Sequence, residues 1–300
     1  MIRPPLVTVI VPGWNIAEFA PAALDSLRAQ TLVAWRALLV DDGSGDGTGA
    51  VFARYADLDD RFRLVPHGRR RGLGAARNTA LDLVETPYLG FLDADDVMTP
   101  RALELLVGSL EESGSDLAVG AYVRLRPDGD GYLPGPVQPW VAEATSPRRT
   151  GVTLDGHPEA TGNVVAWSKV SRTAFWRAHG LRFPEGVLYE DQAVAQRMYT
   201  LARAFDVLPD VVVQWRVRAD GTSITQREAD GDVFLACLEA MRDGLAVLAA
   251  HDPARRARAG QILRMDVPRL QTIADAHPDA SLRSRLAAFA HEVQALASPV

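Results

Sequence analysis

Three aspartates within four residues form the clearest chemical signal in the sequence. Asp93, Asp95 and Asp96 follow the apolar run 88–92, with only Ala94 between them. Carboxylates this close repel one another unless a cation lies among them, and a hard divalent cation prefers carboxylate and phosphate oxygens. The alternative is a capped loop in which Asp96 simply begins a turn. Because the cluster follows a buried strand, we favour binding of a metal ion and a nucleotide.

A second acidic pair, Asp41 and Asp42, follows the apolar run 35–40. The glycines that come next permit tight turning of the chain. An aspartate at such a position can accept a hydrogen bond from the imide N–H of a uracil ring. The alternative is an ordinary loop whose aspartate and serine cap the next helix.

A segment containing glycines opens the helical pattern that starts at residue 73. Gly72 and Gly74 stand where backbone N–H groups and the helix dipole favour phosphate. Arg77 and Asn78 add side chains that can hydrogen-bond a nucleotide. The segment is not a dinucleotide fingerprint, because Arg77 replaces the third glycine. A helix that merely opens with glycine is the alternative.

Two charged motifs lie in the second half of the chain. Glu190 and Asp191 open a helical pattern, where two acids also suit the helix dipole. In the functional interpretation, Asp191 takes a proton from an acceptor hydroxyl. Arg216 and Arg218 follow a strand-like run and could clamp a departing pyrophosphate, and the alternative is surface charge beside a turn.

The first half of the sequence alternates strand and helix patterns, and these elements must position the polar residues. Apolar runs typical of strands are 6–11, 35–40, 62–65, 88–92 and 117–125. Helical spacing covers 20–29, 49–55, 73–84 and 100–112. Repeated units of this kind predict an α/β fold with a mostly parallel sheet and helices on both faces.

Ligands of such sheets bind beyond the carboxyl ends of the strands. Asn15 follows the first strand, Asp41 and Asp42 follow the second, and the 93–96 cluster follows the run 88–92. Three strand ends therefore deliver polar groups toward one edge of the sheet.

The rest of the chain is less regular. Residues 127–162 are rich in proline and glycine, and we expect an irregular excursion that shapes the acceptor side. Runs 164–170 and 207–216 are strand-like. From about residue 230 the pattern is helical, with the helix 257–276 expected to bend or break at Pro268, and with Cys237 as inert core.

Composition excludes several classes of protein. The chain has 300 residues, a net charge of −6 and 47% hydrophobic residues, which suffices for one large α/β domain with a smaller appendage. The acidic balance disfavours nucleic-acid binding. One cysteine excludes a disulfide framework and a cysteine metal site. Without a signal-peptide pattern or a membrane-spanning run, we expect a soluble, cytoplasmic protein.

Taken in this order, the motifs resemble those of the inverting family 2 glycosyltransferases, which have the GT-A fold. The resemblance covers roughly residues 5–225, and it is carried by segments 9–15, 40–44, 74–78, 93–96 and 190–191. The nearest likeness is to bacterial enzymes that decorate teichoic acids, capsules or other surface glycans. Trp14 departs from the tyrosine that the family usually has, and no histidine follows Trp215, where arginine stands instead.

The resemblance implies a role for each motif. The base of a UDP-like donor would be held by Pro12, Trp14, Asn15 and Asp41 or Asp42, with help from Arg77 and Asn78. Asp93 would reach the ribose, and Asp95 would ligate Mn²⁺ or Mg²⁺. Asp191 would be the catalytic base with Glu190 beside it, and the leaving group would lie near Arg216, Arg218 and Ser223.

The implied organisation is a GT-A catalytic domain over 1–228 and a C-terminal helical region over 229–300. Within the catalytic domain, 1–125 would bind the nucleotide sugar and 126–228 would form the acceptor side. The acceptor would be a glycan, a polyol-phosphate polymer or a lipid-linked molecule. The C-terminal helices could form a homo-oligomer or contact the inner face of the membrane.

Five arginines of the C-terminal helices bear on that membrane contact. They are Arg255, Arg256, Arg258, Arg264 and Arg269. They could meet anionic lipid, but an ordinary solvated face is the preferred interpretation. Lys169 is the only lysine, which we attribute to the coding bias of a GC-rich genome.

Three other functions compete with this interpretation. A nucleotidyltransferase would carry a glycine-rich, basic loop directly after the first strand, where this chain has Pro12-Gly13-Trp14-Asn15. A non-catalytic module that binds nucleotide sugars is disfavoured by the presence of both Asp95 and Asp191. An NAD-dependent oxidoreductase would need the glycine pattern that is missing here.

Overall fold

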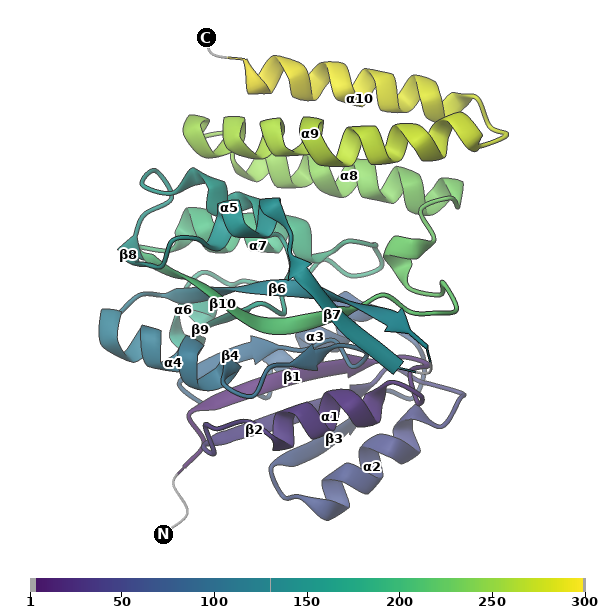
Figure 1. Ribbon diagram of the computed structural model, residues 1–300. Helices are drawn as coiled ribbons and strands as arrows, with labels where there is room; N and C mark the ends of the chain where they lie inside the picture. The colour runs from purple at the N-terminus through teal and green to yellow at the C-terminus, as the bar shows by residue number, and fades with distance from the viewer. Residues whose placement is uncertain (1–3, 130, 299–300) are drawn as a thin grey trace.

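The computed structural model describes residues 4–129 and 131–298, and it has an α/β core with a helical layer on one side (Figure 1). The strands are β1 (Val7–Gly13), β2 (Trp35–Asp41), β3 (Phe62–Pro66), β4 (Tyr88–Phe91), β5 (Val97–Met98), β6 (Leu117–Asp128), β7 (Gly131–Val137), β8 (Arg149–Val152), β9 (Lys169–Arg172) and β10 (Phe205–Arg216). The central runs of β-branched residues are buried on both faces, as in β1, where every residue is buried.

The strand directions bring several carboxyl ends to one edge of the sheet. The strand order is β3-β2-β1-β4-β9-β6-β10-β5. Parallel pairing joins β3, β2, β1 and β4, and also β6 and β10. Because β9 is antiparallel to both β4 and β6, these two strands run in the same direction as each other. The expected mostly parallel sheet is confirmed, and β1, β2, β4 and β10 all end at the same edge.

Helices cover both faces of this sheet. The helices of the described chain are α1 (Ala20–Arg28), α2 (Thr48–Leu58), α3 (Leu73–Leu81), α4 (Ala102–Ser113), α5 (Pro139–Thr145), α6 (Thr173–Ala178), α7 (Asp191–Leu201), α8 (Gly231–Val247), α9 (Asp252–Ala276) and α10 (Ser281–Ala297), with 3-10 turns η1 (Pro158–Gly162) and η2 (Ile224–Gln226). Their apolar spacing explains their packing. In α1, for example, Ala20, Ala23, Leu24 and Leu27 lie on one face and are fully buried.

The expectation of an irregular excursion over 127–162 is wrong. This segment forms β7, α5, β8 and η1. Strand β7 pairs with β6, which precedes it across a turn. Strand β8 pairs with β10, which is distant in sequence. The prolines of β7 hide the strand from pattern analysis, and an outer strand tolerates them because it pairs on one side.

The C-terminal helices have a core of their own. Side chains such as Phe234, Leu286 and Phe289 form a second apolar cluster, which includes the buried Cys237 expected there. Figure 1 shows α8, α9 and α10 stacked beyond α5 and α7, on the side away from α1 and α2. The boundary at residues 228 and 229 stays a prediction. No helix in the described part of the chain is long and apolar enough to cross a membrane.

Two expectations for α9 are corrected. The helix continues through Pro268 without the expected break and packs against α10, while a bend at Pro268 stays a prediction. Arg258 does not belong to a solvated or lipid-facing surface, because its side chain is only 6% exposed. Its guanidinium instead lies 3.9 Å from the half-buried Asp266 and donates to the buried Gln192 of α7 at 3.2 Å.

Candidate active site

The loops after β1 and β2 are bonded to each other at the carboxyl edge of the sheet. The Asn15 backbone N–H donates to Ser44 Oγ at 3.1 Å, and Asn15 Oδ1 accepts from the Gly45 N–H at 3.0 Å. Asn15 has a left-handed backbone with φ +51°, which asparagine tolerates better than most residues. Asn15 therefore joins the two loops, and its contact with a nucleotide stays a prediction.

Trp14 and Asp41 form an accessible wall beside these loops. Trp14 is 40% exposed, and the Arg70 guanidinium lies over its ring, 3.6 Å from the ring centre. Asp41 is half-buried and accepts from the Ser44 N–H at 3.1 Å. A Cβ at Gly49 would lie 2.5 Å from Asp41 Oδ2, so a larger residue there would displace this carboxylate from its present position. Pro12 is buried in β1 behind them.

Asp42 is bound to protein groups on both oxygens. Oδ1 lies 2.7 Å from His67 Nδ1 and accepts from the Arg71 N–H, and Oδ2 accepts from the Gly72 N–H at 2.8 Å. These bonds fix the chain that leads into α3. Of the two aspartates proposed to bind the nucleotide base, Asp41 is the more accessible to a ligand.

Asn78 joins α3 to the loop that precedes α7. Its Nδ2 donates to the Phe183 carbonyl at 2.8 Å, and its Oδ1 accepts from the Phe183 N–H at 3.0 Å. A further bond runs to Glu185 at 3.1 Å. The assignment of Asn78 to the nucleotide stays a prediction, since its amide is already occupied by protein partners.

Arg77 connects the two acidic motifs of the sequence. Its side chain is 1% exposed and donates to Asp93 Oδ1 at 2.7 Å and to Glu190 Oε1 at 2.5 Å. Burial lowers the pKa of Arg77, but the two carboxylates and Asp191 outweigh it, so the guanidinium stays charged. The end of β4 and the start of α7, distant in sequence, thus meet through one cation.

Burial raises the pKa of Glu190 from 4.5 to about 7, with Arg77 opposing the shift. The folded protein therefore holds the proton of Glu190 over a pH range in which the unfolded chain has lost it. We expect the stability of the wild type, relative to Glu190→Gln, to fall as pH rises from about 4.5 to about 7, by at most about 1.4 kcal/mol per pH unit. Urea unfolding of both proteins at several pH values measures this difference, and a difference independent of pH would contradict it.

Asp191 is the first residue of α7 and lies near Lys169, the only lysine of the chain. Burial raises the pKa of Asp191, whereas Arg77 and Lys169 lower it. Lys169 Nζ donates to the Asn163 carbonyl at 2.8 Å, to Asn163 Oδ1 at 2.7 Å and to the Val165 carbonyl at 2.5 Å. Burial lowers the pKa of Lys169 to about 7.

The sequence-based site residues do not include Lys169, whose uniqueness is explained there by genome composition. That uniqueness is the signal in the sequence: Lys and Arg together number 32, and the single lysine among them stands inside a strand. An ammonium can meet three converging carbonyl oxygens with three N–H groups, which a planar guanidinium does not match.

The aspartate cluster after β4 is bound by the end of β10. Arg218 donates to Asp95 Oδ2 from Nε at 2.9 Å and from Nη2 at 2.7 Å. Arg216 donates from Nε to the Asp95 carbonyl and from its backbone N–H to Asp96 Oδ1 at 2.8 Å. The predicted metal ligand and the predicted diphosphate arginines are therefore in contact.

This cluster has the donor chemistry for a cation that also binds phosphate. Asp96 Oδ2 is a buried oxygen without a hydrogen-bond partner in the described part of the chain, and burial with the charges of Asp95 and Asp93 raises the pKa of Asp96. Among the described residues, no group of three or more His, Cys, Asp or Glu side chains could hold a metal by itself. A divalent ion here would take most of its ligands from a diphosphate.

Comparison with known proteins adds the family. A family model described as glycosyl transferase family 2 matches residues 8–167, more than half of the chain. The chain belongs to this family. Within the match lie Trp14, Asp41, Arg77 and the 93–96 cluster, whereas Glu190, Asp191, Arg216 and the C-terminal helices lie outside it.

Relatives of this family 2 chain include an uncharacterized glycosyltransferase, EpsJ of Bacillus subtilis, which is 29% identical over 63% of this chain and 54% of its own length. The chain thus spans about half of that relative. Staphylococcus aureus TarS 1–349, solved in complex with UDP-GlcNAc, has a TM-score of 0.68 at 20% identity and covers 97% of this chain and 88% of its own. Mannosyltransferase PcManGT of Pyrobaculum calidifontis, in complex with GDP-Man and Mn²⁺, has a TM-score of 0.57 at 20% identity, covering 98% of this chain and 87% of its own. These structures establish the GT-A fold.

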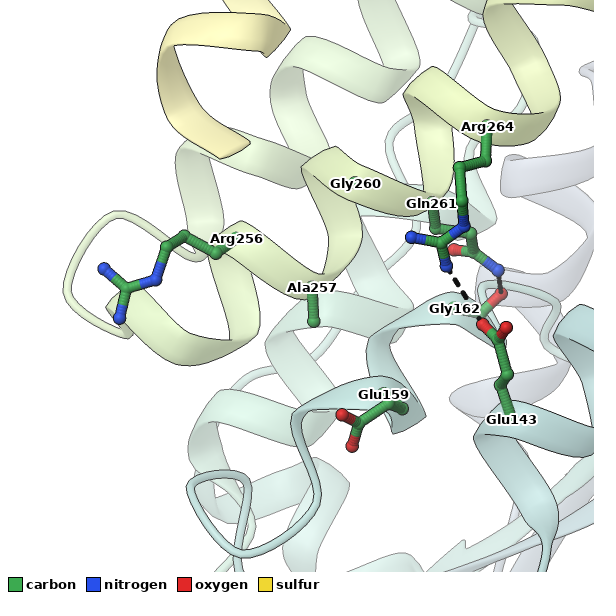
Figure 2. A pocket seen from close by; sticks show the side chains of 8 residues that line it. All are labelled: Glu143, Glu159, Gly162, Arg256, Ala257, Gly260, Gln261 and Arg264. Atoms are coloured by element: carbon green, nitrogen blue, oxygen red, sulfur yellow. Dashed lines mark hydrogen bonds and ion pairs between the residues drawn. The ribbon is translucent and has the colours of Figure 1, made fainter. Parts of the chain in front are cut away.

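Two features of the family 2 chain lie apart from the acidic network. Ser223 donates to Gln226 within its own loop, so its place near a leaving group stays a prediction. A small cavity between α5, η1 and α9 is lined by Glu143, Glu159, Gly162, Arg256, Ala257, Gly260, Gln261 and Arg264 (Figure 2). None of these is a predicted site residue.

Proposed function

We propose that this chain is a metal-dependent inverting glycosyltransferase. It moves a sugar from a nucleoside diphosphate donor, of the UDP-sugar class, to a hydroxyl of a glycan, a polyol-phosphate polymer or a lipid-linked acceptor. The observation that carries the proposal is the contact of Arg77 with both Asp93 and Glu190, at 2.7 and 2.5 Å. Through it, Asp93, proposed for the donor, and Glu190, the neighbour of the proposed base Asp191, belong to one charged network.

In this proposal the donor lies across the carboxyl edge of the sheet. The exposed ring of Trp14 offers a face for the base, and Asp41 offers an acceptor for its imide N–H. Asp93 reaches the ribose. Arg216 and Arg218 stand at the end of β10 beside Asp95, where they can stabilise the charge of the departing diphosphate.

Asp95 would hold Mn²⁺ or Mg²⁺. When bound, such an ion neutralises charge on the diphosphate and acts as a Lewis acid. Arg218 occupies Asp95 Oδ2, so the arginine must share this carboxylate with the ion or shift toward the phosphates. The Mn²⁺ bound with GDP-Man in the PcManGT complex supports the choice of ion class.

The chemical step is a direct displacement at the anomeric carbon. Asp191 accepts the proton of the acceptor hydroxyl while the oxygen of that hydroxyl bonds to the anomeric carbon. The bond from that carbon to the phosphate oxygen breaks, and the nucleoside diphosphate leaves with the electron pair. Attack opposite the leaving group inverts the configuration and converts an α-linked donor into a β-linked product.

A thermal-shift screen of nucleoside diphosphate sugars tests the donor class. We expect a UDP-sugar with Mn²⁺ to raise the melting temperature more than either component alone, because ligands that bind the native state stabilise it. Asp95→Asn should lose the metal-dependent part of this shift, and the exposed control Asp57→Asn should retain it. A rise in melting temperature with every donor in the absence of metal would contradict the role of Asp95. A preference for GDP-sugars would contradict the assignment of uracil as the nucleotide base.

Turnover separates the proposed enzyme from a binding module. Slow hydrolysis of the stabilising donor in the presence of metal is expected of the enzyme, whereas binding without hydrolysis or transfer supports the module. The acceptor class, a place at the inner face of the membrane and assembly through the C-terminal helices stay predictions.

A further inference from the structure

The residues on either side of Glu190 and Asp191 both hydrogen-bond to the C-terminal part of the chain. On one side, the Tyr189 hydroxyl donates to Glu228 Oε1 at 3.1 Å. Glu228 is 5% exposed, and its other oxygen forms an ion pair with Arg269 of α9. The Tyr189 ring packs against the apolar cluster of the C-terminal helices.

On the other side, Gln192 is held by a second arginine of the same helix. Arg258 Nη2 donates to Gln192 Oε1 at 3.2 Å, while its Nη1 donates to Gln261 at 2.6 Å. Gln192 and Arg258 are both buried. Hydrogen bonds from a buried charged group are stronger than those from surface groups, so this contact restrains the start of α7.

The backbone between these two contacts is strained. In the described part of the chain, Asn15 and Tyr189 are the only non-glycine residues with positive φ, and Tyr189 has φ +57°. For a bulky aromatic residue such a conformation costs about 1–3 kcal/mol and persists only where its surroundings enforce it. The Glu228 hydrogen bond and the ring packing are those surroundings.

Helix α9 is itself fastened to the catalytic domain. It crosses η1 so closely that a Cβ at Gly162 would lie 2.5 Å from Gln261 Nε2. Figure 2 shows Gln261 directed at Gly162, and Arg264 paired with Glu143 of α5 at 3.1 Å. The helix therefore serves as a fixed support, and the two arginines that reach α7 and Glu228 extend from it.

We infer that α9 is a positioning element for the proposed base. Arg269, acting through Glu228, fixes Tyr189, and Arg258 fixes Gln192, so that Asp191 meets the acceptor in one orientation. The inference rests on the proposed function and extends it by assigning the C-terminal helices a part in transfer. Neither arginine needs to touch the donor or the acceptor for this role.

The test uses the full chain with three variants: Arg258→Gln, Arg269→Gln and Tyr189→Phe. The last removes a single hydroxyl and so preserves folding if the arginine variants do not. Misplacement of a reacting group by about 1 Å costs roughly 10²-fold in rate, so we expect kcat to fall about 10- to 100-fold in the arginine variants. KM for the donor and its thermal shift should stay within about twofold of the wild type, because the donor contacts are untouched.

Amide hydrogen exchange gives a readout that is independent of turnover. Protection of residues 189–193 should fall in all three variants and recover in part in Arg269→Lys, which keeps the charge near Glu228. The matched control is Arg242→Gln, which removes an exposed ion pair between α8 and α10, with Arg242 Nε 2.8 Å from Glu292. The control should change neither exchange at 189–193 nor kcat.

The outcomes separate the two proposals. Unchanged exchange at 189–193, or a kcat equal to that of the Arg242→Gln control, would overturn the role of α9 while leaving the transferase intact. A wild-type protein that neither binds nor turns over any nucleotide sugar would instead overturn the proposed function, and the inference with it.

Discussion

Asp191→Asn should nearly abolish sugar transfer while leaving donor affinity almost unchanged. Asparagine keeps the size and hydrogen-bonding shape of the side chain but accepts no proton from the acceptor hydroxyl. Loss of a general base reduces rates by about 10²- to 10⁴-fold. The proposed donor contacts involve Trp14, Asp41 and the 93–96 cluster, which are left intact. Steady-state kinetics at saturating donor, together with calorimetry of donor binding, checks both halves of this expectation.

The matched control is Asp243→Asn, which makes the same change on the exposed face of α8. It should retain wild-type turnover. Undiminished transfer in Asp191→Asn would remove this residue as the base. A proportional loss of donor affinity and turnover would instead assign Asp191 to the donor site.

Arg77→Met should lower the free energy of unfolding by about 3–5 kcal/mol, because it leaves the buried Glu190 and the partly buried Asp93 without their cation. Asp93 and Glu190 both bond to this guanidinium, which is 1% exposed. Activity should be lost as well, since the end of β4 and the start of α7 would no longer be joined. Urea denaturation followed by circular dichroism measures the change in stability.

The control is Arg71→Met, which makes the same substitution in the loop just before α3. Arg71 is exposed and pairs with Glu185 only at 3.9 Å, so its loss should cost less than about 1 kcal/mol. The double variant Arg77→Met with Glu190→Gln no longer carries the unpaired charge of Glu190. Its loss of unfolding free energy should therefore be smaller than the sum of the two single losses. Additive losses would contradict the view that Arg77 and Glu190 act as a pair.

The arrangement of the proposed donor side followed from local patterns in the sequence. Short apolar runs, each ended by a polar loop, predicted a parallel sheet, and parallel strands must end at one edge. Asn15, Asp41 and Asp93 could therefore be placed together without coordinates. Their residue types suited a nucleoside diphosphate, and the family match over 8–167 covers these same loops.

Tertiary structure alone decided how the proposed base is held. Lys169 looked like genome composition and Arg258 like solvated charge, yet both are buried near the start of α7. Likewise, β7 and β8 exist because β6 and β10 offer edges to pair with. Sequence patterns report periodic burial within one element. The pairing of buried polar groups from distant elements depends on distances that only the folded chain sets, so a lone lysine or arginine carries no local signal of its partners.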